Sequence, residues 1–139
     1  MHRPGFLPWT LIHACDFMIQ VALNDKVSLR AASKQMGIRP RSLEAIGLDL
    51  VRQGLLSGIR GRHGGYVLAK PAVLITLYDI YLATEAARER MVGSLQEHSI
   101  SEAAAPAYLA ILGAFTDTMK RITLADLMDA VCQRSGQAA

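Results

Sequence analysis

The chain has 139 residues, of which 51% are hydrophobic and 19% are charged, so it can bury a core and a disordered chain is excluded. Its length fits one ordinary domain, or a small domain with an added dimerisation element. Residues 1–70 carry an excess of six positive charges and residues 71–139 an excess of three negative charges. This division favours a nucleic-acid-binding surface in the first half, although it also fits two ordinary solvated faces.

The start of the chain predicts a helix from Pro8 or Trp9 to Leu23. Its apolar run is similar to that of a signal peptide, but His13 and Asp16 interrupt the run and no clean cleavage site follows. No stretch of the sequence is long and apolar enough to span a bilayer. We therefore expect a cytoplasmic protein with no membrane partner.

Two short helices joined by a glycine turn are predicted next. Ser28 is suited to cap the first helix, and Gly37 to end it, because glycine reaches the left-handed conformation at low cost. Pro40 fits the first turn of a second helix, which ends before Gly54. Helices joined in this way are typical of a helix-turn-helix, whose second helix enters the major groove of DNA. The side of the second helix that we expect to face outward carries Arg39, Arg41, Ser42, Ala45 and Arg52.

A tight hairpin follows, with predicted strands at Leu55–Arg60 and Tyr66–Lys70 and a tip at Gly61–Gly65. The glycines permit positive φ angles and close backbone approach, and Arg60 and Arg62 place positive charge at the projecting end. By itself this segment fits an ordinary hairpin with solvated arginines. Directly after a helix-turn-helix, it predicts the wing of a winged helix, whose arginines reach a phosphate or a narrow minor groove.

Two threonines mark helix starts in the last part of the chain. Thr76 is suited to cap a helix from Leu77 to about Ala83, and Thr123 to cap a last helix that runs through Val131. Residues 84–101 are polar and weakly periodic, so we expect a loop or a broken helix there.

A longer helix is expected from about Ala105. Residues 99–102 have the pattern of a capping box, but Pro106 conflicts with so early a start. Such an amphipathic helix needs an apolar partner surface, either on a second subunit or within the same chain. The residues that recur at helical spacing along it are Tyr108, Leu109, Leu112, Phe115, Thr116 and Met119.

Four segments resemble one family, the Rrf2-type winged-helix regulators that include IscR, NsrR and CymR. They are GIRPRSLE from Gly37 together with GLL from Gly54, RGRHGGYVLAKP from Arg60, ITLYDI from Ile75, and RITLADL from Arg121. The resemblance implies a mostly α fold, with a winged helix-turn-helix in residues 1–83 and a loop and dimerisation helices in residues 84–139. It also implies a homodimeric transcription regulator, usually a repressor, that binds a partly palindromic operator in double-stranded DNA.

Eight residues are the expected DNA-binding set. Arg39, Arg41 and Ser42 would read base edges in the major groove, because arginine suits O6 and N7 of guanine. The family commonly has an aromatic residue after Arg41, so Ser42 predicts a different operator. The wing would contact the backbone or the minor groove. The whole set is Ser28, Arg39, Arg41, Ser42, Ala45, Arg60, Arg62 and His63.

Three other residues of the second helix bear on this interface. Gly47 in mid-helix costs about 1 kcal/mol relative to alanine, and close packing against the first helix of the helix-turn-helix would explain it. Glu44 and Asp49 would repel phosphate. We therefore expect Asp49 on the edge turned away from DNA and Glu44 near the rim of the DNA backbone.

Cluster-binding members of the family carry three cysteines in the region of residues 84–101, where this chain has none, and thiolates are what hold an iron–sulfur cluster. The two cysteines present, Cys15 and Cys132, match no metal motif. Cys15 lies on an apolar stripe, where a buried, inert thiol is expected. We therefore expect no metal and no cofactor.

One alternative stays open, an unusual cluster held by His98, Glu97 and an aspartate from two subunits. Cluster-free members of the family respond to a partner protein or another signal. A regulatory protein or a small-molecule signal is accordingly an expected further partner.

An enzyme is not expected. The glycine loop at residues 61–65 lacks the Gly-Lys-Ser/Thr of a phosphate-binding loop, and the four histidines are scattered without a local serine or cysteine partner. Winged helices also serve as protein-interaction modules, and this second class of function remains an alternative to DNA binding. A weak dependence of DNA affinity on salt would favour it.

Overall fold

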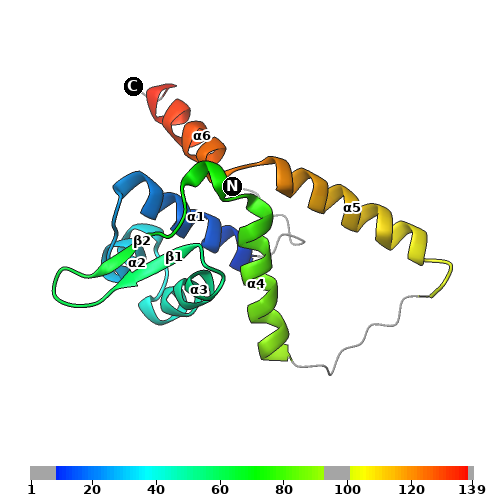
Figure 1. The fold of residues 1–139 in the computed structure, drawn as a ribbon, viewed down its shortest axis with the longest axis horizontal. Helices are drawn as coiled ribbons and strands as arrows, with labels where there is room; N and C mark the ends of the chain where they lie inside the picture. The colour runs from blue at the N-terminus through cyan, green and yellow to red at the C-terminus, as the bar shows by residue number, and fades with distance from the viewer. Residues whose placement is uncertain (1–8, 93–100, 138–139) are drawn as a thin grey trace.

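The computed structural model describes residues 9–92 and 101–137. Its elements are the helices α1 (Trp9–Asn24), α2 (Leu29–Met36) and α3 (Pro40–Arg52), the strands β1 (Leu56–Ile59) and β2 (Gly65–Leu68), the short 3₁₀ turn η1 (Ala72–Leu74), and the helices α4 (Leu77–Val92), α5 (Ala105–Arg121) and α6 (Leu124–Gln137). In Figure 1, α1–α3 and the hairpin gather on one side of α4, and α5 extends away on the other. The predicted mostly α, winged helix-turn-helix fold is confirmed.

The turn between α2 and α3 is organised by local hydrogen bonds. Ser28 caps α2 by accepting a hydrogen bond from the Ala31 N–H at 3.1 Å. Gly37 ends the helix with φ at 68°, in the left-handed region that favours glycine. The buried Ser33 then donates its hydroxyl to the Ile38 carbonyl, and its own carbonyl accepts the Ile38 N–H at 3.2 Å. Both ends of α2 therefore follow the prediction.

The two strands of the wing are hydrogen-bonded to each other and also to the segment between α1 and α2. β1 and β2 are antiparallel, with Leu56 opposite Leu68 and Ile59 opposite Gly65. On its other edge β2 meets Val27, whose N–H donates to the Tyr66 carbonyl at 3.1 Å and whose carbonyl accepts the Tyr66 N–H at 2.8 Å. These bonds set the position of the wing relative to α2.

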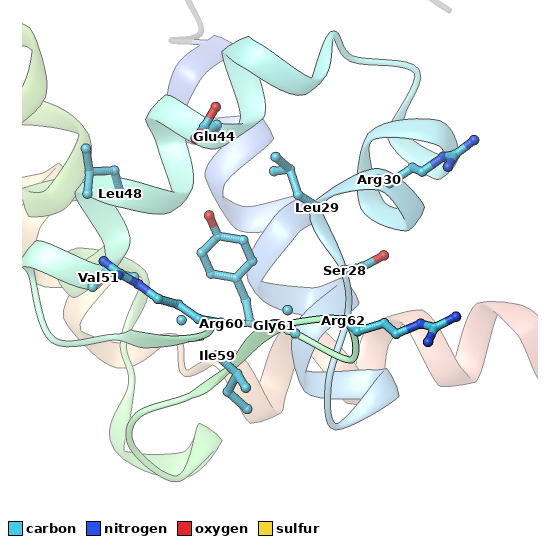
Figure 2. Close-up of a pocket in the computed structure, with 14 residues that line it drawn as sticks. Ser28, Leu29, Arg30, Glu44, Leu48, Val51, Ile59, Arg60, Gly61 and Arg62 are labelled. Carbon is cyan, nitrogen blue, oxygen red and sulfur yellow. The ribbon is translucent and has the colours of Figure 1, made fainter.

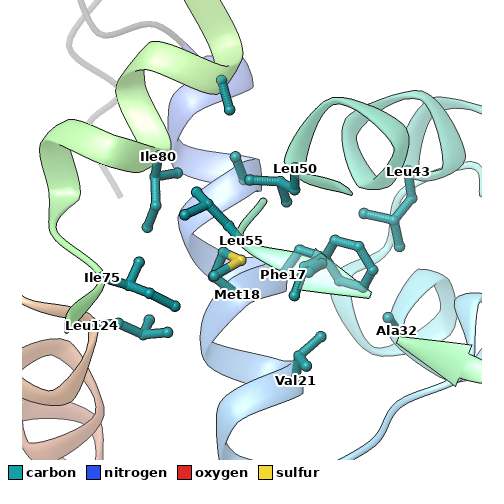
Figure 3. Close-up of a cluster of buried hydrophobic side chains, with 13 residues drawn as sticks. Phe17, Met18, Val21, Ala32, Leu43, Leu50, Leu55, Ile75, Ile80 and Leu124 are labelled. Carbon is teal, nitrogen blue, oxygen red and sulfur yellow. The ribbon is translucent and has the colours of Figure 1, made fainter. Parts of the chain in front are cut away.

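The hydrophobic core lies between α1, α3, α4 and the start of α6 (Figure 3). Gly47 lies against this core, because a Cβ atom there would be 3.0 Å from Tyr66 Oη and 3.2 Å from Phe17 Cε1. The atoms nearest to this position belong to α1 and β2, whereas the sequence pointed to the first helix of the helix-turn-helix as the close neighbour. The largest fully buried side chains are Phe17, Met18, Val21, Leu43, Leu50, Leu55, Leu56, Ile75, Ile80 and Leu124.

Two helices are longer than predicted. The segment from Thr84, expected to be a loop or a broken helix, continues α4 as helix through Val92, and α6 continues past Val131 to Gln137. Alanine, glutamate, arginine and methionine all favour helix, so residues 85–92 form one without a clear apolar stripe. The Thr84 hydroxyl donates to the Tyr81 carbonyl at 2.8 Å, which satisfies a polar side chain inside the helix. Residues 93–100 of the expected loop lie outside the described residues.

The start of α5 agrees with the later of the two expected positions. The helix begins at Ala105, with Ala104 as an N-cap that makes no side-chain hydrogen bond and a proline in the first turn. The first two residues of the expected capping box at 99–102 lie outside the described residues. Across the described ranges 9–92 and 101–137, no helix is long and apolar enough to cross a bilayer.

Candidate nucleic-acid interface

The first turns of α3 present polar side chains to solvent. Arg39, which is the N-cap of α3, is exposed together with Arg41, Ser42 and Ala45. Leu43 and Leu50, on the opposite side of the helix, are fully buried in the core and hold this face outward. The amino-terminal part of a recognition helix is the part that reaches base edges in helix-turn-helix complexes.

The wing carries its charged residues at the tip. Arg60, Arg62 and His63 are all exposed. The tip depends on glycine at two positions, because a Cβ atom on Gly64 would overlap the Ile59 carbonyl and Gly61 has φ at 108°. Lys26 contacts the tip directly, since its Nζ donates to the carbonyl of His63 at 2.8 Å. The backbone of His63 is thus held, while its side chain stays exposed.

A groove of about 750 Å³ separates α3 from the wing. Figure 2 shows Glu44, Leu48 and Val51 on the α3 side, with Ile59 and Arg60 on the wing side. In the same view, the Arg60 side chain extends toward Val51, and the side chains of Arg30 and Arg62 project to the opposite side. The groove therefore has positive charge at both of its ends and apolar side chains between them.

The structure brings some of the expected residues to this groove and leaves others outside it. Ser28, Arg60 and Arg62 line the groove, whereas Arg39, Arg41, Ser42 and Ala45 lie on the outer face of α3 and His63 lies at the tip. The Ser28 hydroxyl also serves as the α2 cap, so it has one structural role already.

Sequence reasoning did not single out Arg30, Leu48 or Ile59. Arg30 lies two residues after the Ser28 cap, in the exposed first turn of α2. That position next to a predicted cap is the sequence feature that could have identified Arg30. Leu48 and Ile59 look like core residues in the sequence, and only the placement of the wing shows that they line the groove.

The electrostatics of the groove depend on one carboxylate and three arginines among its lining residues. Glu44 lines the groove close to Tyr66. The pKa of the Tyr66 hydroxyl is raised above its ordinary value, first by burial and second by the negative charge of Glu44. Arg30, Arg60 and Arg62 outnumber it, so the groove suits a polyanion. Asp49 does not line the groove, and its carboxylate pairs with Arg52 at 3.6 Å.

The two cysteines occupy different environments and different helices. Burial, followed by the negative charge of Asp16, raises the pKa of the Cys15 thiol to about 12, so a thiolate is disfavoured there. Cys132 is exposed on α6. Within residues 9–92 and 101–137, no group of three or more His, Cys, Asp and Glu side chains could hold a metal ion. Glu97 and His98, the donors of the alternative cluster, lie outside those ranges.

Comparisons with known proteins agree with this geometry. The model of the Rrf2 family, described as an iron-dependent transcriptional regulator, matches residues 10–130. The HTH-type transcriptional regulator IscR of Cereibacter sphaeroides is 40% identical over 68 residues, which are 49% of this chain and 44% of that protein. IscR of Escherichia coli O1:K1 / APEC is 36% identical over 76 residues, 52% of this chain and 47% of that protein. The matches thus span about half the length, or less, of these curated relatives.

Two solved structures share the fold over most of the chain. CymR, the global cysteine regulator of B. subtilis, superposes with a TM-score of 0.71 at 24% identity, covering 94% of this chain and 98% of that chain. T. potens IscR gives a TM-score of 0.70 at 23% identity, covering 94% and 88%. The donor set found among the described residues does not fit the iron that the family description implies. The family model nevertheless matches most of the sequence, and the chain belongs to the Rrf2 family of transcriptional regulators.

Proposed function

We propose that this protein is a homodimeric, sequence-specific DNA-binding transcription regulator that acts as a repressor and carries no iron–sulfur cluster. The observation that carries the proposal is the pairing of an outward, arginine-bearing α3 face with a wing whose arginines line the adjoining groove. A polyanionic duplex matches both surfaces, because one presents donors to base edges and the other presents cations to the backbone.

In this proposal α3 enters the major groove. Arg39, Arg41 and Ser42 lie in or next to its first turn, where recognition helices contact base edges. The wing follows the backbone or the minor groove with Arg60, Arg62 and His63. Glu44 lines the groove and does not lie on the reading face, so it does not contact bases. Its negative charge limits how tightly the groove can hold phosphate.

The proposed dimer uses α5. Five large apolar side chains on this helix are exposed, a pattern that a solvated helix does not sustain. Ile111, Ala114, Phe115 and Thr118 also line a shallow, largely apolar hollow of about 400 Å³. We assign residues 1–83 to DNA binding and residues 84–139 to dimerisation. The five exposed side chains are Tyr108, Leu109, Ile111, Leu112 and Phe115.

A cluster-free state is supported by the thiol chemistry of the described residues. Cys15 is held as a neutral thiol in the core, and Cys132 lies alone on the exposed surface of α6. We propose that regulation comes instead from a partner protein or a small molecule, and that the chain is not an enzyme.

The test combines a spectrum with DNA binding. Protein purified without oxygen is expected to be colourless, and its affinity for a DNA duplex to fall steeply between two salt concentrations because arginine–phosphate contacts release counterions. A brown protein with visible absorption would overturn the cluster-free assignment and favour donors such as His98. Colourless protein that ignores DNA at low salt would instead favour a protein-interaction module.

A further inference from the structure

The side chain of Tyr66 reaches from β2 of the wing to α3. Its ring meets the buried Phe17 of α1 edge-on, with the ring centroids 5.2 Å apart and the planes at 76°. Its hydroxyl end lies over Gly47 of α3, where a Cβ atom would be only 3.0 Å from the Tyr66 Oη. The position of the hydroxyl is therefore fixed by the core and by α3, and it does not depend on the wing tip.

The Tyr66 hydroxyl is open to the groove between α3 and the wing. Tyr66 is one of the lining residues of this groove, and no described residue forms a hydrogen bond with its hydroxyl. Among the described residues no side-chain polar atom is both buried and unpaired, so solvent reaches this hydroxyl. Burial, and second the negative charge of Glu44, raise the pKa of the hydroxyl, which keeps its proton at neutral pH. The proton is thus available to an acceptor that enters the groove.

Gly58 leaves the wing side of the groove without a side chain next to Tyr66. The two residues are paired across the hairpin, so they share the face that is turned toward α3. A Cβ atom on Gly58 would meet nothing within 4 Å among the described residues, and the backbone there lacks the positive φ that requires glycine. A glycine inside a strand is typical of a place where a ligand or another backbone approaches closely. Here the space that it leaves belongs to the groove.

We propose that the Tyr66 hydroxyl donates a hydrogen bond to a phosphate oxygen of one DNA strand, and that Gly58 leaves room for this strand. This inference rests on the proposed DNA-binding function and names the side chain that holds the strand inside the groove. If α3 lies in the major groove and the wing reaches the minor groove, the DNA backbone that separates them runs between α3 and the wing. Arg60 and Arg62 supply positive charge at the two ends of the groove, and Tyr66 adds a neutral donor from its inner face.

The first experiment removes only the hydroxyl. Tyr66→Phe keeps the ring against Phe17 and Gly47, so its thermal unfolding midpoint should match that of the unmodified protein. We expect its Kd for a fluorescent DNA duplex to rise about threefold to tenfold, because one hydrogen bond is lost. The salt slope should not change, since a neutral donor releases no counterion, whereas Arg62→Gln should make the slope shallower.

Tyr78→Phe is the matched control, because it removes a hydroxyl from α4, outside the groove, and should leave the Kd unchanged. An unchanged Kd for folded Tyr66→Phe would overturn the contact. A salt slope that changes as much as it does in Arg62→Gln would overturn it as well, because the effect would then be one of charge.

Neutral methylphosphonate linkages identify the acceptor. A binding site selected from random duplexes is prepared with one pair of symmetry-related phosphates replaced in each duplex. At the contacted phosphates the replacement should weaken the unmodified protein, and Tyr66→Phe should add no further loss. At other phosphates that the protein contacts, the two losses should multiply, because they are independent. A loss from Tyr66→Phe that is the same in every duplex would overturn the phosphate contact.

Gly58→Val tests the space beside the hydroxyl. Valine favours strand and its side chain would enter open space, so the thermal midpoint should equal or exceed that of the unmodified protein. We expect the Kd for DNA to rise about tenfold or more, because the added side chain overpacks the place of the strand. Ser57→Val is the matched control, since Ser57 is exposed in the same strand but does not line the groove. Folded Gly58→Val that binds DNA as tightly as the unmodified protein would overturn the inference.

These measurements separate the contact from the proposed function. If the unmodified protein shows no salt-dependent DNA binding, the proposed function fails and the contact fails with it. If the unmodified protein binds DNA with a steep salt slope while folded Tyr66→Phe and Gly58→Val bind equally well, the contact alone fails.

Discussion

Thr76 and Thr123 face each other across an isolated antiparallel bridge, at the starts of α4 and α6. The residue after each threonine donates its N–H to the carbonyl of the residue before the other threonine, at 2.8 Å in both directions. Each threonine begins the same sequence pattern, Thr-Leu-x-Asp, and closes a reciprocal capping box with its aspartate, Asp79 or Asp126. The bond from the Thr123 backbone also lowers the pKa of Asp126 below its ordinary value.

The paired caps predict a specific loss of stability. Thr76→Ala or Thr123→Ala removes a hydroxyl that accepts an N–H at 3.1 Å, so each should lower the free energy of unfolding by about 1 kcal/mol. Thr→Ser at the same position keeps the hydroxyl and is the control. Urea denaturation followed by circular dichroism measures both. Equal losses for serine and alanine would show that the methyl group, and not the cap, is what matters.

Gly47→Ala should destabilise the protein even though alanine favours helix. The new methyl group would lie 3.0 Å from Tyr66 Oη and 3.2 Å from Phe17 Cε1, and Phe17 is fully buried and cannot move freely. Overpacking costs about 1–3 kcal/mol, against a propensity gain of about 1 kcal/mol. Gly136→Ala in α6 is the control, because a Cβ atom there would meet no side chain and no other segment within 4 Å among the described residues. A thermal midpoint that rises for Gly47→Ala would contradict the packing argument.

The two thiols should react at very different rates. Cys132 is exposed, whereas burial raises the pKa of the Cys15 thiol to about 12 and so removes its reactive thiolate near neutral pH. A disulfide reagent should therefore modify one thiol in the native protein and two after unfolding. Cys132→Ser should leave no rapidly reacting thiol. Fast modification of Cys15 in the folded variant would mean that α1 opens readily.

Arg41 and Arg62 should affect DNA binding in different ways. Arg41→Ala removes a side chain on the proposed reading face of α3, so the preference for operator over random DNA should shrink. Arg62→Ala removes a charge from the wing, so affinity for every sequence should fall by a similar factor. A binding site selected from random duplexes would serve as the operator. If both variants lose equally on operator and random DNA, this division of roles is wrong.

The exposed face of α5 predicts a change of oligomeric state on substitution. Leu109 and Phe115 keep 63% and 56% of their surfaces exposed, and Leu109→Glu or Phe115→Glu should convert the proposed dimer into a folded monomer. Val73→Glu on η1 is a matched control, since Val73 is 64% exposed but lies outside α5. Sedimentation velocity reports the masses. Dissociation caused by Val73→Glu, or none caused by the α5 variants, would move the interface elsewhere.

The sequence by itself determined the features that depend on near neighbours in the chain. Ser28 and Gly37 mark the two ends of α2 and Pro40 marks the start of α3, because caps and left-handed turns are set within a few residues. The glycine-rich wing and the outward arginines of α3 follow from equally local patterns. The end of α4 does not follow from such a local pattern. Residues 85–92 have good helix propensity but lack the apolar stripe from which the length of a helix is predicted.

Only the tertiary structure decided how segments distant in the sequence meet. Gly47 packs against Phe17 and Tyr66, and two similar capping boxes 47 residues apart pair with each other. The groove that Leu48 lines exists because Val27 and Lys26 bond the wing to the segment before α2, while Tyr66 packs at Gly47 of α3. An apolar residue has the same pattern in the sequence whether it is buried or lines a groove. Its role is settled by what the rest of the fold places opposite it, and that depends on contacts far along the chain.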